Sequence, residues 1–105
     1  APPEEPARDR LQVRAPALRG LVAENINPAV IAELNLASGA SGVVVTGAED
    51  IAWRAGLRVG DIVLAINRQP IHTTADLERV LRDAVRSWEV EILREGRRSW
   101  LRFRL

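Results

Sequence analysis

The chain has 105 residues, of which 47% are hydrophobic and 28% charged, with a net charge of +1 and no cysteine. This length and composition are typical of one globular domain. They exclude a disulfide framework, thiolate chemistry and a strongly basic surface that would attract nucleic acid as a whole. No apolar run approaches the roughly 20 residues that a membrane span needs.

The first ten residues, Ala1 to Arg10, hold three of the six prolines and no apolar side chain larger than proline. Such a segment buries too little apolar surface to offset the entropy of ordering, so we interpret it as a linker. Leu11 to Arg14 alternates apolar and polar residues, which allows a short strand. We therefore expect a linker over residues 1–14, in a piece of a longer polypeptide, and a folded domain over residues 15–105.

A helix is predicted to begin at Asn27 and Pro28. Asparagine is a good N-cap, and proline at the first helical position gives up an N–H that has no partner within the helix. Val30, Ile31 and Leu34 then fall on one face of this helix. The glycine-rich residues 38–42 form a turn into the next strand.

Two apolar β-branched runs, Val43–Val45 and Ile62–Ile66, predict buried strands. Between them, Asp50 is expected to cap a short helix that ends at Gly56, where a left-handed residue is favoured. A turn follows the helix. We expect the Asp61 carboxylate to bond backbone N–H groups there, as a turn residue and not as a catalytic acid.

The last third of the chain predicts a helix and a hairpin. Thr73 to Asp76 forms a capping-box pattern, and apolar residues recur at helical spacing up to Val85. Residues 88–92 alternate strictly, residues 94–97 form a hairpin turn, and residues 99–105 make a final strand.

One stretch of this scaffold resembles a known family. Ala55 to Asn67, AGLRVGDIVLAIN, is similar to the A-G-L-x-x-G-D-x-I-x-x-I-N signature of bacterial PDZ domains. The helical segment NPAVIAELNL, residues 27–36, resembles a helix inserted in PDZ domains of the HtrA/Deg serine proteases. The proline- and glutamate-rich start resembles the tether before the second C-terminal PDZ domain of the Do-like members. The resemblance covers residues 15–105, with the linker as weaker support.

The resemblance implies a mixed α+β fold, a small partly open β-barrel or sandwich of five or six strands capped by two or three helices. It places a carboxylate-binding loop of pattern x-Φ-G-Φ at Leu18 to Leu21, followed by the edge strand of a peptide groove. The helix that begins near Thr73 would form the far wall. Arg19 departs from the apolar residue usual at its position. The implied peptide-binding residues are Leu18, Arg19, Gly20, Leu21, Val22, Ala23, Leu77 and Val80.

No catalytic, metal-binding or cofactor-binding group is expected. His72 is the one histidine, and without a neighbouring nucleophile or a second ligand we interpret it as a turn residue. Five arginines between Arg94 and Arg104 suggest a nucleic-acid surface, but three glutamates lie close in sequence, so we expect a solvated face. Trp53 and Trp88 are interpreted as packing residues.

The expected function is that of a non-catalytic interaction module of a periplasmic HtrA/Deg-type serine endoprotease, active in quality control of envelope proteins. Its partners would be peptide C-termini, unfolded segments, or other domains and subunits of the parent protease. Peptide capture and subunit assembly both remain open. An alternative also remains open, in which the chain is the PDZ domain of another envelope protein, such as a site-two-type metalloprotease or a secretion component. Membrane insertion and an enzyme in its own right are disfavoured.

Overall fold

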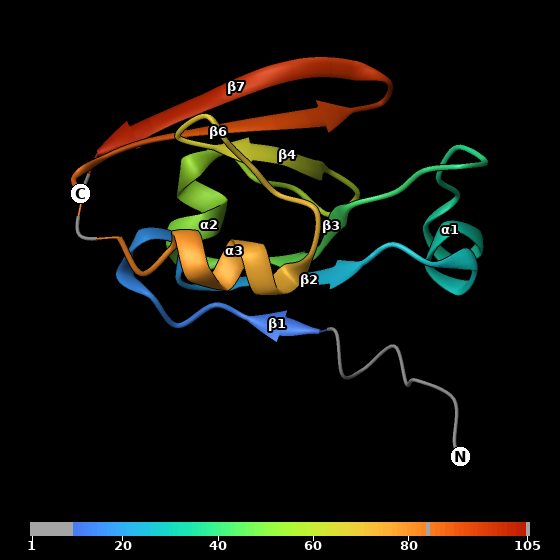
Figure 1. The fold of residues 1–105 in the computed structure, drawn as a ribbon, viewed down its shortest axis with the longest axis horizontal. Coiled ribbons are helices and arrows are strands. Elements are labelled where there is room, and N and C mark those ends of the chain that lie inside the picture. Colours follow the sequence, from blue (N-terminus) through green and yellow to red (C-terminus); the bar gives the residue numbers. More distant parts are fainter. Residues whose placement is uncertain (1–9, 84, 105) are drawn as a thin grey trace.

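The computed structural model describes residues 10–83 and 85–104 (Figure 1). The linker expected at the start of the chain lies largely outside these residues. The strands are β1 (Leu11–Gln12), β2 (Leu21–Asn25), β3 (Val43–Ala48), β4 (Ile62–Ile66), β5 (Gln69–Pro70), β6 (Ser87–Arg94) and β7 (Arg97–Arg104). The helices are the 3-10 helix η2 (Pro16–Leu18) and the α-helices α1 (Pro28–Leu34), α2 (Asp50–Ala55) and α3 (Thr74–Val80).

The strands form one antiparallel sheet in the order β1-β2-β3-β4-β6-β7, with β5 attached to β4. The two predicted apolar runs lie at its centre, where Val43 of β3 is opposite Val63 of β4. The register shifts between Val22 and Ala23 and again between Val63 and Ala65, which bends the sheet. The expected mixed α+β fold is confirmed. Within the described residues the sheet is open and has seven strands, two of them only two residues long.

The helix boundaries depend on identifiable caps. The Asn27 side chain accepts a hydrogen bond from the Val30 N–H over 2.9 Å, and Thr73 and Asp76 form the predicted capping box. Gly56 ends α2 in the left-handed conformation, with φ 107°. These three predictions are confirmed.

The predicted cap at Asp50 is wrong. Glu49 is the N-cap of α2 and Asp50 is the first helical residue. The reason is a contact from another part of the chain, because the Ala52 N–H donates to the carbonyl oxygen of Arg19 over 3.1 Å. That carbonyl satisfies a first-turn donor, and the Asp50 carboxylate pairs with the Arg19 side chain instead.

The last helix is shorter than its apolar period predicts. α3 ends at Val80, and the N–H groups of Arg82 and Asp83 donate to carbonyls only three residues back. Such bonds tighten a final helical turn and stop its propagation. Val85, predicted on the buried face, is exposed, and Ala84 lies outside the described residues. The early end directs the chain toward β6, where Trp88 is buried.

Asp61 and Arg94 form a partly buried ion pair under the turn before β4. The Asp61 side chain is almost completely buried and accepts hydrogen bonds from the Arg58 backbone N–H and from Nε of Arg94, over 2.9 and 2.7 Å. Arg94 also donates to the carbonyl oxygen of Gly56. The hydrogen bond to Asp61 raises the pKa of Arg94 further above its already high value. The turn role predicted for Asp61 is confirmed, and its arginine partner is new.

The β6–β7 hairpin places its charges in pairs. Arg102 contacts Glu89 over 2.8 Å and Arg98 contacts Glu91 over 3.0 Å, each across the two strands. With Arg94 held by Asp61, three of the five arginines that suggested nucleic acid have carboxylate partners. Cross-strand pairing of this kind supports the interpretation of a solvated sheet face.

The apolar interior has two parts. The main cluster lies between the sheet, α2 and α3, and includes Leu57, Ile66, Leu77, Val90 and Ile92. A smaller cluster, with Val30, Val44 and Ile62 at its centre, packs α1 against the sheet at one end of the molecule (Figure 1). Within the described residues, no helix is long and apolar enough to cross a membrane.

Candidate functional site

The loop before β2 depends on Gly20. Its φ of 95° favours glycine, and an added Cβ would lie 2.2 Å from the carbonyl oxygen of Glu49. Two backbone bonds fasten the loop to the start of α2, from Glu49 N–H to Gly20 O and from Ala52 N–H to Arg19 O, over 3.0 and 3.1 Å. The glycine is therefore required by close packing behind the loop, and its N–H donates to the carbonyl oxygen of Val13.

Strand β2 has one edge on β3 and the other edge beside α3. Leu21 and Ala23 are fully buried, whereas Val22 is half-buried. The Asn25 side chain at the end of β2 accepts a hydrogen bond from the Thr74 N–H at the start of α3, over 2.8 Å. β2 and α3 are thus joined at one end of the space between them.

Five of the eight predicted site residues lie together in the interior, whereas Gly20 and Val22 are partly buried and Arg19 is exposed. Leu18, Leu21, Ala23, Leu77 and Val80 all belong to the main buried cluster, so the structure does bring the loop, the strand and the helix together. Arg19 does not join them. Its exposed side chain pairs with Asp50 of α2 over 3.2 Å.

The edge of β2 beside α3 is covered by β1. Leu11 lies opposite Ala23 and Gln12 opposite Val22, in an antiparallel register. The pairing continues to Val13, whose N–H donates to Leu21 O over 2.8 Å and whose carbonyl oxygen accepts from Gly20 N–H over 3.3 Å. The N-terminal segment therefore adds a strand to this edge.

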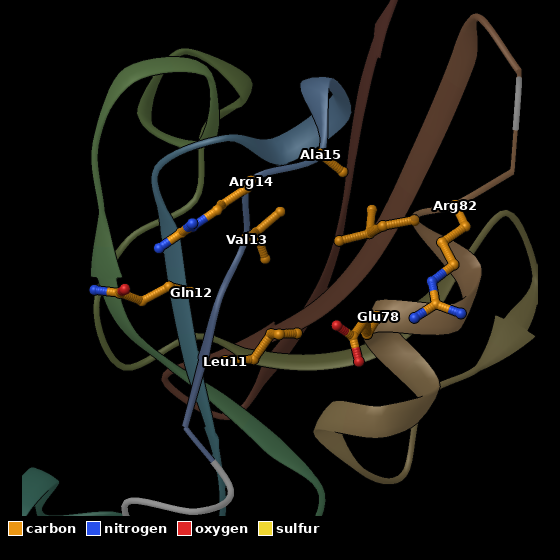
Figure 2. A pocket seen from close by; sticks show the side chains of 8 residues that line it. Leu11, Gln12, Val13, Arg14, Ala15, Glu78 and Arg82 are labelled. Atoms are coloured by element: carbon orange, nitrogen blue, oxygen red, sulfur yellow. The ribbon is translucent and has the colours of Figure 1, made fainter.

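The side chains of the segment alternate between two directions. Figure 2 shows Leu11 and Val13 directed toward α3, and Gln12 and Arg14 directed away from it. Val13 is only 6% exposed and belongs to the main buried cluster. A cavity of about 350 Å³ remains between the segment and α3. It is lined by Leu11, Gln12, Val13, Arg14, Ala15, Glu78, Leu81 and Arg82.

Several residues of this site were not predicted as site residues. Leu11 and Val13 carried a signal in their alternation, which indicated a strand but not its partner. Leu81 lay on the predicted apolar face of the helix. Glu78 and Arg82, at the rim of the cavity (Figure 2), gave no signal beyond a charged helix surface.

The charged and polar groups near this site bond to close neighbours. Arg10 contacts the nearly buried carboxylate of Glu24 over 3.2 Å, next to the start of β1. His72 is exposed, and its backbone N–H donates to the Asp76 carboxylate over 3.0 Å. Residues 10–83 and 85–104 contain no group of three potential metal ligands. The cavity is lined by the apolar side chains of Leu11, Val13 and Leu81, with the charged residues Glu78 and Arg82 at its rim.

A comparison with protein families identifies this architecture. The profile of the PDZ domain family matches residues 43–94. The chain belongs to the PDZ domain family. The matched residues run from β3 to the end of β6, and so contain the AGLRVGDIVLAIN stretch and the groove helix α3.

Curated relatives of this PDZ domain are much longer proteins. A probable periplasmic serine endoprotease, DegP-like, from Pseudomonas savastanoi pv. phaseolicola is 35% identical over 86 residues, covering 78% of this chain and 18% of the relative. A protein of the same description from Chlamydia pneumoniae is 30% identical over 67 residues, covering 62% of this chain and 14% of that relative. The chain thus spans less than a fifth of the length of these relatives.

Solved structures share the fold. The HtrA-type protease AlgW with a decapeptide has a TM-score of 0.73 at 22% identity, over 81% of this chain and 27% of that one. The HtrA3 PDZ domain bound to a phage-derived ligand, FGRWV, has a TM-score of 0.65 at 20% identity, over 81% of this chain and 80% of that domain.

Proposed function

We propose that this PDZ domain is a non-catalytic peptide-binding module that adds an extended peptide to β2 and reads its last side chain between the Gly20 loop and α3. The observation that carries the proposal is the seating of residues 11–13 on that edge. This pairing supports the proposal, because β1 is an antiparallel strand on that edge with an apolar side chain directed at α3. Addition of a strand to an exposed sheet edge is a common mode of peptide recognition.

Each predicted site residue has a role in this proposal. The backbone of β2 supplies hydrogen bonds through Leu21, Val22 and Ala23, and the Gly20 N–H meets the end of the peptide. Leu18, Leu21, Leu77 and Val80 form the apolar floor beneath its last side chain, with Leu81 beside the opening. Arg19, held by Asp50, positions the loop and does not touch the peptide.

The parent protein is also part of the proposal. DegP-like relatives at 30–35% identity and HtrA-type structural neighbours favour a periplasmic HtrA/Deg-type serine endoprotease, with residues 15–105 as a C-terminal PDZ domain and residues 1–10 as its tether. The sequence encoded upstream tests this. A trypsin-like domain with a Gly-Asn-Ser-Gly-Gly motif would establish the proposed serine endoprotease as the parent protein. A membrane metalloprotease domain there would rule it out.

Peptide binding is tested with FGRWV, the ligand named for the HtrA3 PDZ domain. We expect the ¹⁵N-labelled chain to show amide shifts confined to Gly20–Asn25, the β1 segment and α3 when FGRWV is added. The same peptide with a C-terminal amide should bind more weakly, because a neutral group gains less from backbone N–H donors than a carboxylate does. Strand β7, on the far edge of the sheet, is the internal control.

Two results would contradict the proposal. Equal binding of the acid and the amide would remove the carboxylate from the recognition mechanism. The second result is an absence of amide shifts with FGRWV and with a panel of peptides ending in Val, Leu or Phe. If this holds both for wild type and for a variant that detaches β1 from β2, such as Val13→Pro, the assembly role is favoured. The second candidate has one observation in its favour, which is that β1 already covers the edge.

A further inference from the structure

The β1 segment occupies the position that the proposed peptide would take. Val13 uses both of its backbone groups, donating to Leu21 O and accepting from Gly20 N–H. A peptide added to β2 needs those same two groups for its last residue. Because one edge of a strand pairs with one partner at a time, the peptide and the segment exclude each other.

We propose that Leu11 to Arg14 is a tethered competitor for the peptide groove, with Val13 in the place of the peptide's last residue, so that a peptide binds only by displacing the segment. This inference rests on the proposed function of the groove. It further assigns the ligand as an extended peptide whose last side chain is about the size of valine, as in FGRWV. Val13 has such a side chain, and it faces α3 (Figure 2).

The side chains of the segment provide enough contact to hold it in place but not to make it permanent. Val13 is buried in the main cluster, but Leu11 is only half-buried, and Gln12 and Arg14 are exposed. The strand itself is two residues long. Segments with few buried contacts open at a small fraction of the free energy of global unfolding.

Charge adds a second weak contact. Arg10 pairs with Glu24 of β2 at the start of the segment, and the Arg10 side chain is 56% exposed. An ion pair in such a position is screened by salt and contributes little. The cavity between the segment and α3 removes packing on one side of Leu11 and Val13.

The competitor is effective because it is covalently attached. Only six residues separate Val13 from Gly20, so the segment is always close to the edge that it covers, at an effective concentration on the order of millimolar. A free peptide must compete with that concentration. Its apparent affinity equals its affinity for the open groove multiplied by the fraction of molecules in which the groove is open.

The first test uses the unaltered chain. We expect the Val13 amide to be protected from hydrogen exchange in the free chain, because it donates to Leu21 O. Saturating FGRWV should abolish this protection while the amides of β2 stay protected. If FGRWV binds at the β2 edge and the Val13 amide remains protected, the competitor assignment is overturned and the proposed function survives.

The second test is Val13→Pro, which removes the donor N–H and keeps a small apolar side chain. We expect this variant to bind FGRWV more tightly than wild type by about tenfold, as the closed fraction is lost. Gln12→Ala is the matched control. It changes an exposed side chain directed away from α3 and should leave the affinity unchanged. Equal affinity for wild type and Val13→Pro would overturn the inference.

The remaining outcomes are also decisive. Binding by Val13→Pro but not by wild type would support a fully closed groove. Binding by neither, with β2 amides still protected, would overturn both the proposed function and the competitor role and leave β1 as a permanent strand. Loss of Val13 protection on dilution would place the segment in a second copy's groove and overturn the intramolecular assignment.

Discussion

The side-chain oxygen of Asn25 accepts a hydrogen bond from the backbone N–H of Thr74 over 2.8 Å. Asn25 ends β2 and Thr74 begins α3, so this bond joins the two walls of the candidate groove. It also satisfies a donor in the first turn of α3, which has no partner within the helix. The spacing of the groove is therefore set by a residue outside the predicted peptide-binding set.

Asn25→Leu should weaken both the fold and the groove. The Thr74 N–H would lose its acceptor, at a cost of about 1 kcal/mol in the free energy of unfolding. Binding of FGRWV should fall as the start of α3 loosens. Asn25→Asp keeps an acceptor oxygen and is the matched control, which should retain stability and binding. Urea unfolding and peptide titration measure the two effects, and a leucine variant as stable as wild type would refute this role.

Gly20→Ala should be more destabilising than Gly60→Ala. The two glycines have nearly the same positive φ, 95° and 97°, so the backbone strain is common to both substitutions. They differ in surroundings, because a Cβ at Gly20 meets the backbone of Glu49 and a Cβ at Gly60 meets nothing within 4 Å. We expect an additional loss of about 1–3 kcal/mol for Gly20→Ala. If the two variants lose the same free energy of unfolding in urea, the loop around Gly20 can make room for a Cβ at no additional cost.

Arg94→Ala should unfold the chain more easily than Arg102→Ala. Removing Arg94 leaves the buried Asp61 carboxylate without its cation, which costs about 3 kcal/mol or more. Removing Arg102 breaks an exposed pair with Glu89, which costs less than about 1 kcal/mol. Both arginines lie on the same hairpin, and the loss of the hydrogen bond from Arg94 to the Gly56 carbonyl oxygen adds to the difference. Similar losses for the two variants would place the Asp61 carboxylate in contact with water.

The capping box of α3 should weaken in acid. Hydrogen bonds from the backbone N–H groups of His72 and Thr73, and the nearby Arg79, lower the pKa of Asp76 below its ordinary value of 3.8, against an opposing effect of burial. A carboxylate whose pKa is lower in the folded state stabilises the fold above 3.8, and this contribution is lost as the pH falls through the folded value.

Asp76→Asn tests this pH dependence. The amide keeps an acceptor oxygen but does not titrate. Between about pH 6 and about pH 2.5, we expect the free energy of unfolding of wild type to fall further than that of Asp76→Asn. The other carboxylates titrate equally in both chains, so the difference reports on Asp76. Parallel curves would show that the Asp76 carboxylate makes no titrating contribution to the cap.

Local chemistry determined the parts of the fold that the sequence alone predicts. Asn27 and Pro28, the Thr73 capping box and the left-handed Gly56 act within one helical turn, so their neighbours in sequence are their neighbours in space. The apolar runs of β3 and β4 predict buried strands for the same reason. The AGLRVGDIVLAIN stretch combines these local signals at a fixed spacing, which is why the family can be identified from it.

The tertiary structure decided which partners those elements meet. Asp61 receives Arg94 from 33 residues away, and Ala52 receives the carbonyl of Arg19, which displaces Asp50 from the cap. The alternation of Leu11 and Val13 predicts a strand but not its place, because backbone groups pair in the same way along any open edge. Only the packed molecule shows that this strand lies on β2, where the N–H and carbonyl of Val13 occupy the backbone groups that we assign to a bound peptide.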